Sequence, residues 1–263
     1  MSEIACRVQF AREIAVNAGK LLKGEFGKSI LYERKTSVID LVTQVDRMSE
    51  RYLVDRIEAA FPSDMVVTEE SGVVQSGGNG FSWVVDPLDG TTNFVHSFPH
   101  FAVSIGILSG GTPAGAVIYA PIANELFHAE TGCGAFLNNQ RIHVSQTSAL
   151  SEALLATGFP YNRRAIIDEL LIYIRRAVLS AHGIRRCGSA ALDLCSVAAG
   201  RVDGFWEQGL KPWDLAAGVL IVTESGGTIT DFDGGNHDMN AGRTVASNKL
   251  IHGELLRTVL RGE

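Results

Sequence analysis

Several familiar signals are missing from this chain of 263 residues, and each absence narrows what it can be. The four cysteines show no C-x-x-C spacing and no short disulfide framework, so we expect reduced thiols and a cytoplasmic protein. No apolar run approaches the ~20 residues that a membrane-spanning helix requires. Charged residues interrupt the N-terminal stretch where a signal peptide would need a hydrophobic core, so we expect a soluble chain.

The sequence also has little basic charge. Its net charge of −6 argues against a general nucleic-acid or membrane partner, because phosphate backbones and anionic lipids attract basic surfaces. The net charge still allows a local basic patch, because three arginine pairs fall within one stretch: Arg163-Arg164, Arg175-Arg176 and Arg185-Arg186.

The signatures of several common enzyme classes are missing too. There is no H-E-x-x-H, no G-x-S-x-G and no P-loop, so the sequence lacks the usual motifs of zinc proteases, serine hydrolases and P-loop nucleotide hydrolases. The seven histidines show no metal-ligand spacing, and we interpret them as structural or exposed. Hydrophobic residues make up 46% and charged residues 20%, an ordinary composition for a globular protein.

The most informative segment, residues 83–94, reads WVVDPLDGTTNF. Its apolar start predicts a buried strand, and Pro87 cannot continue a hydrogen-bonded ladder, so we expect the strand to end at this point. Asp86 and Asp89 then lie at a strand end, and Gly90-Thr91-Thr92 offers backbone N–H groups where a helix can begin. Carboxylates bind hard divalent cations and a helix start binds phosphate. The segment therefore predicts metal-dependent phosphoryl chemistry.

Two further acidic positions complete the pattern. Glu69 follows a short apolar strand, as Asp86 does. Asp214 follows Pro212 at the expected start of a helix, where it is either a metal ligand or simply the residue that caps the helix. Four scattered carboxylates thus have the residue types and settings of a magnesium site.

The apolar patterns predict an α+β half followed by a more parallel α/β half, with a soft boundary near residue 147. In residues 1–147 we expect helices at 4–22 and 48–61 and strands at 65–68, 82–85, 101–108, 114–119 and 125–128. In residues 148–263 we expect a strand at 154–157 and helices at 168–179, after Gly188, after Pro212 and at 249–260.

Taken in order, these motifs closely resemble the inositol monophosphatase family, within the magnesium-dependent, lithium-sensitive sugar phosphatases. The matching elements are Asp40-Leu41-Val42-Thr43-x-x-Asp46, Glu69-Glu70-Ser71, the segment 86–94, Gly188-Ser189-Ala190-Ala191, Trp213-Asp214-x-Ala216-Ala217-Gly218, Gly226-Gly227 and Asn248. The resemblance implies a five-layer α-β-α-β-α sandwich that mixes α/β and α+β features, a homodimer, and inhibition by Li⁺.

The resemblance also implies which residues hold the metal ions. Glu69, Asp86 and the Leu88 carbonyl would bind a first Mg²⁺. Asp86, Asp89 and Asp214 would bind a second, while Glu69 would help to hold a weaker third.

The implied catalytic residues are Asp46, Glu69 and Thr91, with Thr91 and Asp46 orienting a metal-activated water. The implied substrate contacts are Glu69, Leu88, Asp89, Gly90, Thr91, Thr92, Arg185, Ser189, Ala190, Glu207 and Asp214. Lys35 would lie near the metal loop, although it also fits a plain surface lysine. Glu207, Arg186 and Lys211 likewise fit solvated surface charges, and the alternative for either basic residue is a contact to an anionic substrate.

The implied reaction is hydrolysis of myo-inositol 1-phosphate or a similar polyol or sugar phosphate. Segments 157–161 and 209–212 resemble the microbial branch rather than the animal enzymes, which leaves inositol specificity open. Fructose 1,6-bisphosphate, histidinol phosphate and nicotinamide dinucleotide phosphates are alternative substrates. A regulatory protein that binds transcription machinery, with the arginine pairs as its docking surface, is the alternative from another class.

Overall fold

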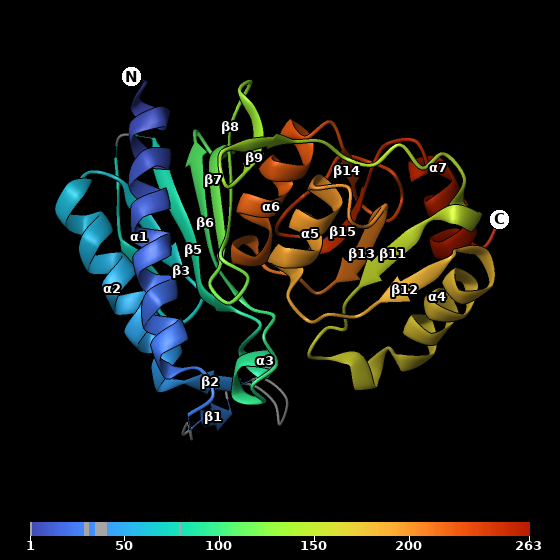
Figure 1. Cartoon of the computed structure of the whole chain (residues 1–263), viewed down its shortest axis with the longest axis horizontal. Coiled ribbons are helices and arrows are strands. Elements are labelled where there is room, and N and C mark those ends of the chain that lie inside the picture. Colours follow the sequence, from blue (N-terminus) through green and yellow to red (C-terminus); the bar gives the residue numbers. More distant parts are fainter. Residues whose placement is uncertain (1, 29–31, 35–40, 79) are drawn as a thin grey trace.

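The computed structural model describes residues 2–28, 32–34, 41–78 and 80–263. Their elements stack in five layers, helix, sheet, helix, sheet and helix, from one end of the molecule to the other (Figure 1). This arrangement confirms the five-layer α-β-α-β-α sandwich and its mixture of α/β and α+β features. None of the described helices is both long and apolar enough to cross a membrane.

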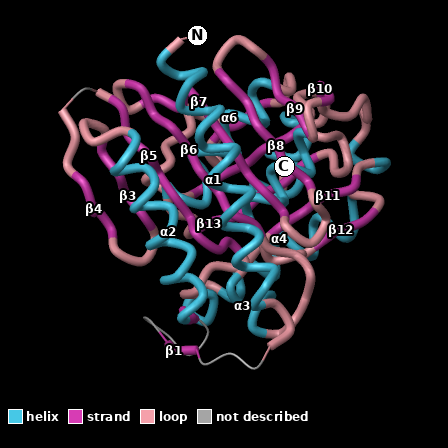
Figure 2. The backbone as a smooth tube through the Cα atoms, turned by 60° about the vertical axis from the view of Figure 1, so that its left-hand side comes forward, coloured by secondary structure: helices cyan, strands magenta, loops and turns pink. Residues whose placement is uncertain are grey.

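Two helices form the outer layer at the N-terminal end. Helix α1 (Glu3–Glu25) is capped by the Ser2 hydroxyl and turns a stripe of small and aliphatic side chains toward the first sheet. Helix α2 (Gln44–Ala60) starts earlier than its apolar pattern predicts, because Thr43 and Asp46 close a capping box over its first turn. A short pair of strands, β1 (Tyr32–Arg34) and β2 (Leu41–Thr43), precedes it and lies near α3 (Thr91–Val95) (Figure 2).

The first sheet has eight strands within the described residues, in the order β10-β9-β8-β7-β6-β5-β3-β4. Only the β3–β5 pair among these neighbours is parallel. The strands are β3 (Met65–Thr68), β4 (Gly72–Gln75), β5 (Phe81–Asp89), β6 (Ala102–Ser109), β7 (Thr112–Ala120), β8 (Glu125–Glu130), β9 (Gly134–Leu137) and β10 (Gln140–Ile142). The five predicted strands of this half are confirmed. Strands β4 and β10 form the sheet edges, β9 lies next to β10, and each has only three or four residues, too few to give a clear pattern.

Strand β5 corrects the prediction that Pro87 ends it. The strand continues to Asp89, and its register against β6 shifts between Asp86, opposite Ser104, and Asp89, opposite Ala102. Three steps along β5 thus match two along β6, which defines a bulge. Proline is tolerated there because a bulged residue does not need to donate to the ladder.

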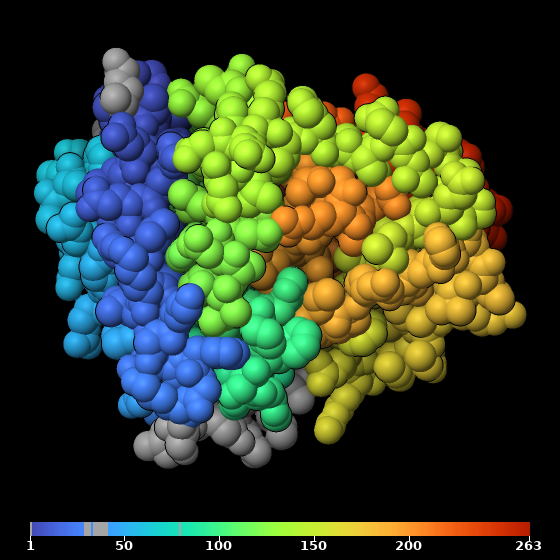
Figure 3. Space-filling view, in the orientation of Figure 1, coloured from blue at the N-terminus to red at the C-terminus, as the bar shows by residue number. Residues whose placement is uncertain are grey.

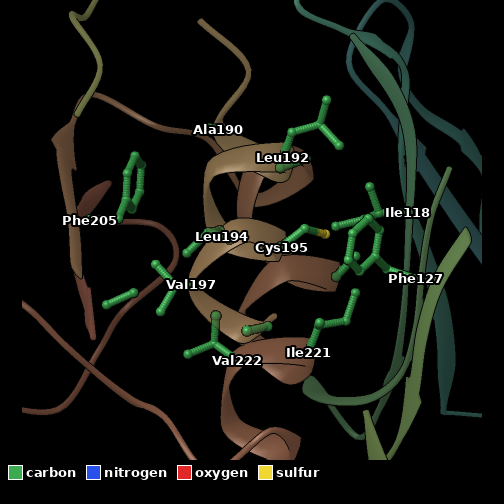
Figure 4. Packing of buried hydrophobic residues seen from close by; sticks show 14 of the residues in the cluster. Ile118, Phe127, Ala190, Leu192, Leu194, Cys195, Val197, Phe205, Ile221 and Val222 are labelled. Atoms are coloured by element: carbon green, nitrogen blue, oxygen red, sulfur yellow. The ribbon is translucent and has the colours of Figure 1, made fainter. Parts of the chain in front are cut away.

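Helices α5 (Ala190–Ala198) and α6 (Pro212–Glu224) form the middle layer between the sheets. Their apolar side chains contact Ile118 and Phe127 of the first sheet and Phe205 of the second (Figure 4). Helix α6 lies against β6 where Gly106 has no side chain, since a Cβ there would overlap Ala216. This close approach places the start of α6 beside the end of β5.

The second sheet has the order β12-β11-β13-β15-β14. Its strands are β11 (Leu154–Thr157), β12 (Gly183–Arg185), β13 (Gly204–Gln208), β14 (Thr228–Thr230) and β15 (Arg243–Ser247). Strand β11 is parallel to both β12 and β13, whereas β15 runs antiparallel to β13 and β14. The expected parallel arrangement is therefore found only among the three neighbouring strands β12, β11 and β13.

The last layer covers the far face of the second sheet. It contains α4 (Ile167–Ser180), α7 (His252–Glu254) and a π-helical segment (Leu255–Arg261), while 3₁₀ turns lie at Leu150–Glu152 and Arg163–Ala165. The closing helix expected from residue 249 begins at His252 instead and is mostly π-helical.

A buried ion pair holds α1 against the first sheet. Arg7 of α1 donates to both carboxylate oxygens of Asp64, at 2.7 and 2.8 Å, and the Trp83 indole N–H donates to the same carboxylate at 2.8 Å. The Arg7 guanidinium also lies 3.8 Å from the centroid of the Phe81 ring. The hydrogen bond to Asp64 is the main cause that raises the pKa of Arg7 above its usual value. Asp64 thus has its cation supplied by the chain itself.

Candidate metal and catalytic site

Three carboxylates converge where β5 meets the start of α6. An oxygen from each of Asp86, Asp89 and Asp214 lies within 4.8 Å of the others. The bulge in β5 keeps Asp86 and Asp89 in the ladder at the strand end, and Asp214 lies in the first turn of α6. The structure therefore brings together three of the residues that the sequence identifies as metal ligands.

Asp214 does not occupy the capping position that its sequence setting also allowed. The cap is Lys211, and Asp214 is the third residue of the helix, with one carboxylate oxygen accepting the Lys211 N–H at 2.7 Å. This bond fixes the carboxylate at the helix start and leaves its second oxygen for another partner.

The electrostatics of this cluster favour a bound cation. Burial raises the pKa of Asp86 well above its usual value, and the charges of Glu69, Asp89 and Asp214 raise it further. Burial and Glu69 raise the pKa of Asp214 in the same way, and burial raises that of Asp89 to about 6. A divalent ion relieves the desolvation and the repulsion together, and all-oxygen donors suit Mg²⁺.

Glu69 lies at the edge of the cluster. It follows β3, and its backbone N–H donates to the Val85 carbonyl at 3.1 Å, which places it next to β5. It is outside the three-carboxylate group, yet its charge contributes more to the raised pKa of Asp86 than Asp89 or Asp214 does. Glu69 also lines a cavity of about 690 Å³ beside α2.

The turn that carries Glu69 is held by a residue that sequence reasoning missed. Glu50 of α2 accepts the Glu70 N–H at 3.1 Å and the Ser71 hydroxyl at 2.5 Å. Glu50 is only 6% exposed, although a glutamate on a polar helix gives no sign of burial in the sequence. Its role follows only from the packing of α2 against the β3 end.

Asp46 and Thr91 form a pair next to the carboxylates. The Thr91 hydroxyl oxygen lies 2.9 Å from one Asp46 carboxylate oxygen and 3.1 Å from the Leu88 carbonyl oxygen. The other Asp46 oxygen accepts the Thr43 N–H at 2.8 Å. Burial raises the pKa of Asp46, while the hydrogen bonds from Thr43 and Thr91 act in the opposite direction. Asp46 also accepts the Thr43 hydroxyl, at 2.5 Å. A buried carboxylate held in place by two hydroxyl partners is suited to accepting a proton.

The segment Gly90-Thr91-Thr92 begins α3, as expected. Gly90 has φ of +92° and caps the helix, and a Cβ at this position would lie 3.1 Å from the His100 carbonyl oxygen. Glycine is required by both the backbone angle and the space. The first N–H groups of a helix have no partner within it, so they are available to an anion.

Ser189 and Ala190 are tied to the site through Asp89. The Ser189 hydroxyl donates to an Asp89 carboxylate oxygen, and the Ala191 N–H donates to the same oxygen at 3.0 Å. The Ser189 oxygen also accepts the Leu192 N–H at 3.3 Å as the cap of α5. The start of α5 therefore positions a candidate metal ligand.

Glu207 lies on β13, a strand of the second sheet. Burial raises its pKa to about 8, and the charge of Asp193 adds to this, whereas that of Arg186 lowers it. The Arg186 guanidinium lies 5.3 Å from the centroid of the Phe159 ring. Arg185 and Arg186 are both exposed, and Arg185 donates to the Ile184 carbonyl at 3.0 Å, but of these two arginines only Arg186 has a charge that acts on the pKa of Glu207.

The structure adds little on three residues named from the sequence. Lys35, together with Asp40 of the first matching motif, lies outside the described residues. The Lys211 side chain is exposed, and its backbone N–H contributes the bond to Asp214.

The chain is similar to known proteins over nearly its whole length. The sequence model of the "Inositol monophosphatase family" matches residues 3–262. The chain is 42% identical over 254 residues to the inositol-1-monophosphatase of Synechocystis sp., covering 97% of this chain and 88% of that protein. It is 42% identical over 240 residues to the Nus factor SuhB of Vibrio cholerae, covering 89% and 90%.

A solved inositol monophosphatase from Anabaena superimposes with a TM-score of 0.89 at 40% identity, covering 99% of this chain and 97% of the other. Sequence and fold agree over nearly the whole length, and the chain belongs to the inositol monophosphatase family.

Proposed function

We propose that this protein is a Mg²⁺-dependent phosphomonoesterase that hydrolyses myo-inositol 1-phosphate or a related polyol or sugar phosphate. The observation that carries the proposal is the convergence of Asp86, Asp89 and Asp214 within 4.8 Å of one another, next to the Asp46–Thr91 pair. Family membership and the name of the Synechocystis relative, inositol-1-monophosphatase, support the reaction class.

The residues present fit magnesium. Glu69, Asp86, Asp89, Asp214 and the Leu88 carbonyl would hold two ions, with Glu69 contributing to a weaker third. Their donor atoms are all oxygen, and a cation would offset the desolvation and repulsion that raise the pKa values of Asp86 and Asp214. When bound, Mg²⁺ supplies Lewis acidity that polarises the phosphate ester and makes a water more acidic.

Asp46 and Thr91 would orient and deprotonate the attacking water. The 2.9 Å contact between the Thr91 hydroxyl and Asp46 lets Thr91 donate to the carboxylate and accept from a water, which fixes the water's direction. The capping bonds from Thr43 hold Asp46 in place, so little reorganisation is needed when the proton moves. No covalent phosphoenzyme is required.

The substrate phosphate would lie on the N–H groups of Gly90, Thr91 and Thr92 at the start of α3. The polyol hydroxyls would contact Ser189, Ala190 and Glu207, with Arg185 or Arg186 nearby. A carboxyl group with a pKa of about 8 is protonated at neutral pH and can donate to a sugar hydroxyl.

A panel of phosphate esters, assayed with and without Mg²⁺ and Li⁺, tests this proposal. We expect hydrolysis of inositol 1-phosphate or a related ester only with Mg²⁺, and inhibition by Li⁺. The same panel separates sugar bisphosphates, histidinol phosphate and nicotinamide dinucleotide phosphates as alternative substrates. Equal activity in EDTA contradicts the mechanism.

A second candidate function, binding to transcription machinery, is supported by the name "Nus factor SuhB" of several relatives and by the surface of α4. That helix exposes the apolar side chains Ile167, Leu171, Ile172, Val178 and Leu179, at 45–71% exposure. Arg175 is exposed beside them, whereas Arg176 is half-buried and donates to the Leu260 carbonyl at 3.0 Å. Exposed apolar rows of this kind are typical of docking surfaces.

Paired variants separate the two functions. Asp89→Asn removes a metal ligand, so it should abolish hydrolysis and leave binding to elongation complexes intact. Arg175→Glu with Leu171→Ser should weaken that binding and leave hydrolysis unchanged. Arg176 is left unaltered because its substitution would also disturb the π-helical segment. If neither variant changes either assay, both functions are assigned wrongly.

A further inference from the structure

Three side chains with metal-binding atoms gather outside the carboxylate site. His100 precedes β6, Cys187 lies between β12 and α5, and Asp193 belongs to the first turn of α5. One ligand atom from each lies within 4.8 Å of the other two. The group joins the first sheet's half of the molecule to the second.

Two of these side chains carry buried polar atoms without a partner. Nε2 of His100 and Oδ2 of Asp193 accept or donate no hydrogen bond among the residues that the structure describes. Asp193 is only 3% exposed. Native structures satisfy nearly all buried polar atoms, because each unsatisfied one costs about 1–3 kcal/mol. Two such atoms on side chains that converge in one small group indicate a missing ligand.

We propose that His100, Cys187 and Asp193 form a second metal site, which binds a borderline-soft divalent cation of the Zn²⁺ class. Imidazole nitrogen, thiolate sulfur and carboxylate oxygen are the donors that this class of ion selects. Two metal–ligand bonds of ~2.0–2.3 Å bring donor atoms to within ~4.5 Å, so the present separations need only small side-chain rotations. Three protein ligands leave a fourth position for water.

The protonation of the group is compatible with this assignment. Burial lowers the pKa of His100, so its imidazole is neutral at pH 7 and has a lone pair for a metal. Burial raises the pKa of the Cys187 thiol, and an entering cation would displace that proton to water. Thiolate and carboxylate together would neutralise a divalent charge.

The backbone around the site is already ordered. The Asn93 side chain of α3 donates to the His100 carbonyl at 2.7 Å and to the Cys187 carbonyl at 2.9 Å. Asp193 is fixed by its N–H, which donates to the Ser189 carbonyl at 2.9 Å. Figure 3 shows the green α3 segment lying against the gold-to-orange segment that leads into α5. The metal would thus clamp two segments that already touch.

This site is chemically distinct from the magnesium site. Asp86, Asp89 and Asp214 offer oxygen only, whereas the second group includes sulfur and nitrogen. The two are connected through α5, since Ser189 at the helix start donates to Asp89 and Asp193 follows one turn later. A cation at His100, Cys187 and Asp193 would therefore fix the helix end that positions Asp89.

Cobalt(II) provides a direct test on the whole chain, because a thiolate ligand gives it a near-ultraviolet charge-transfer band that oxygen ligands do not. Protein stripped with a chelator is titrated with Co²⁺ in excess Mg²⁺, which occupies the carboxylate site. We expect this band in the wild type and in Cys133→Ser, a control that removes an exposed thiol elsewhere. Cys187→Ser should lose it.

Zinc affinity, measured by competition with a chromophoric chelator, gives the second readout. Cys187→Ser and Asp193→Asn should each weaken Zn²⁺ binding by at least ~10–100-fold, because even the loss of an outer partner has that effect. Circular dichroism checks that both near-isosteric variants are folded. Absence of the charge-transfer band, or equal Zn²⁺ affinity in wild type and Cys187→Ser, would overturn the proposal. Neither readout depends on phosphatase activity.

Discussion

Asp64 and Asp86 are equally buried, each at 1% exposure, yet their surroundings are opposite. Asp64 receives two hydrogen bonds from Arg7 and one from Trp83, so its charge is neutralised within the fold. Asp86 lies among Glu69, Asp89 and Asp214, and no cation of the described fold neutralises its charge. Burial and these like charges raise its pKa instead. Burial alone therefore does not mark a functional carboxylate, whereas burial among like charges does.

Asp64 and Asp86 therefore contribute differently to the stability of the protein. A buried carboxylate with its own cation fixes the packing of α1 on the first sheet, and its partner is costly to remove. Buried carboxylates that repel one another destabilise the metal-free protein and become favourable only with an added cation. We therefore expect substitutions in the carboxylate cluster to reduce activity more than stability, and substitutions in the Arg7–Asp64 pair to reduce stability more than activity.

The largest effect is expected for Asp86→Asn. Asp86 is the ligand that both proposed ions share, so its loss should lower kcat/KM by ~10⁴-fold, about 5 kcal/mol of transition-state stabilisation. The amide oxygen can still accept the Leu88 N–H, now 2.9 Å from Asp86 Oδ1, so the bulge should be retained. Thermal unfolding in EDTA should occur at the same temperature or higher, because one repelling charge is gone. A variant that retains activity, or unfolds markedly earlier, contradicts this account of the cluster.

Arg7→Met should give the reverse result. It leaves Asp64 buried and unpaired, which should cost about 3–4 kcal/mol of unfolding free energy in urea denaturation. The kcat of the remaining folded protein should change little, since Arg7 is not part of the site. The double variant Arg7→Met/Asp64→Asn keeps an acceptor for the Trp83 indole without the charge, so it should recover part of the loss. No recovery would mean that the cation–π contact with Phe81 matters more than the ion pair.

Lower pH should stabilise the metal-free protein. The pKa of Glu207 is raised from its ordinary 4.5 to about 8 in the fold. Between these values the folded chain keeps a proton that the unfolded chain has released. The resulting stability is fully present below about 4.5 and is lost as the pH rises through about 8. Glu207 alone contributes a slope of at most ~1.4 kcal/mol per pH unit, and the aspartates of the site, whose pKa values are also raised, add to it.

Urea denaturation in EDTA at pH 5.5 and 7.5 measures this slope. Glu207→Gln has no titrating group at that position, so its stability should depend less on pH over the same interval. Identical slopes in the wild type and in the variant would show that Glu207 is ionised in the folded protein at neutral pH.

The sequence predicted the carboxylate cluster because its members follow local patterns. Asp86 and Asp89 come after an apolar run, and Asp214 comes after a proline that starts a helix. Strand ends and helix starts are where polar side chains can meet without occupying the core. The prediction that Pro87 ends β5 was wrong, because proline is equally compatible with a strand end and with a bulge.

Residues that act through distant packing had no local signal. Arg7 and Asp64 are 57 positions apart, and nothing in either neighbourhood indicates an ion pair. Glu50 has the pattern of an ordinary helix surface residue, yet it holds the turn that carries Glu69. His100 is far in the sequence from Cys187 and Asp193, so no spacing rule for metal ligands could group the three.

The smallest effect is expected at a surface ion pair. Arg201 donates to both Glu125 oxygens, at 2.7 and 2.5 Å, but its side chain is 45% exposed. Glu125→Gln removes the charge and leaves the Arg201 guanidinium over the Phe127 ring, 5.8 Å from its centroid. It should cost only about 0.5 kcal/mol of unfolding free energy, and high salt should reduce that further. The Arg7→Met loss should persist in salt because Arg7 and Asp64 are shielded from it. If both losses are equal, or both disappear in salt, burial is not what distinguishes the two pairs.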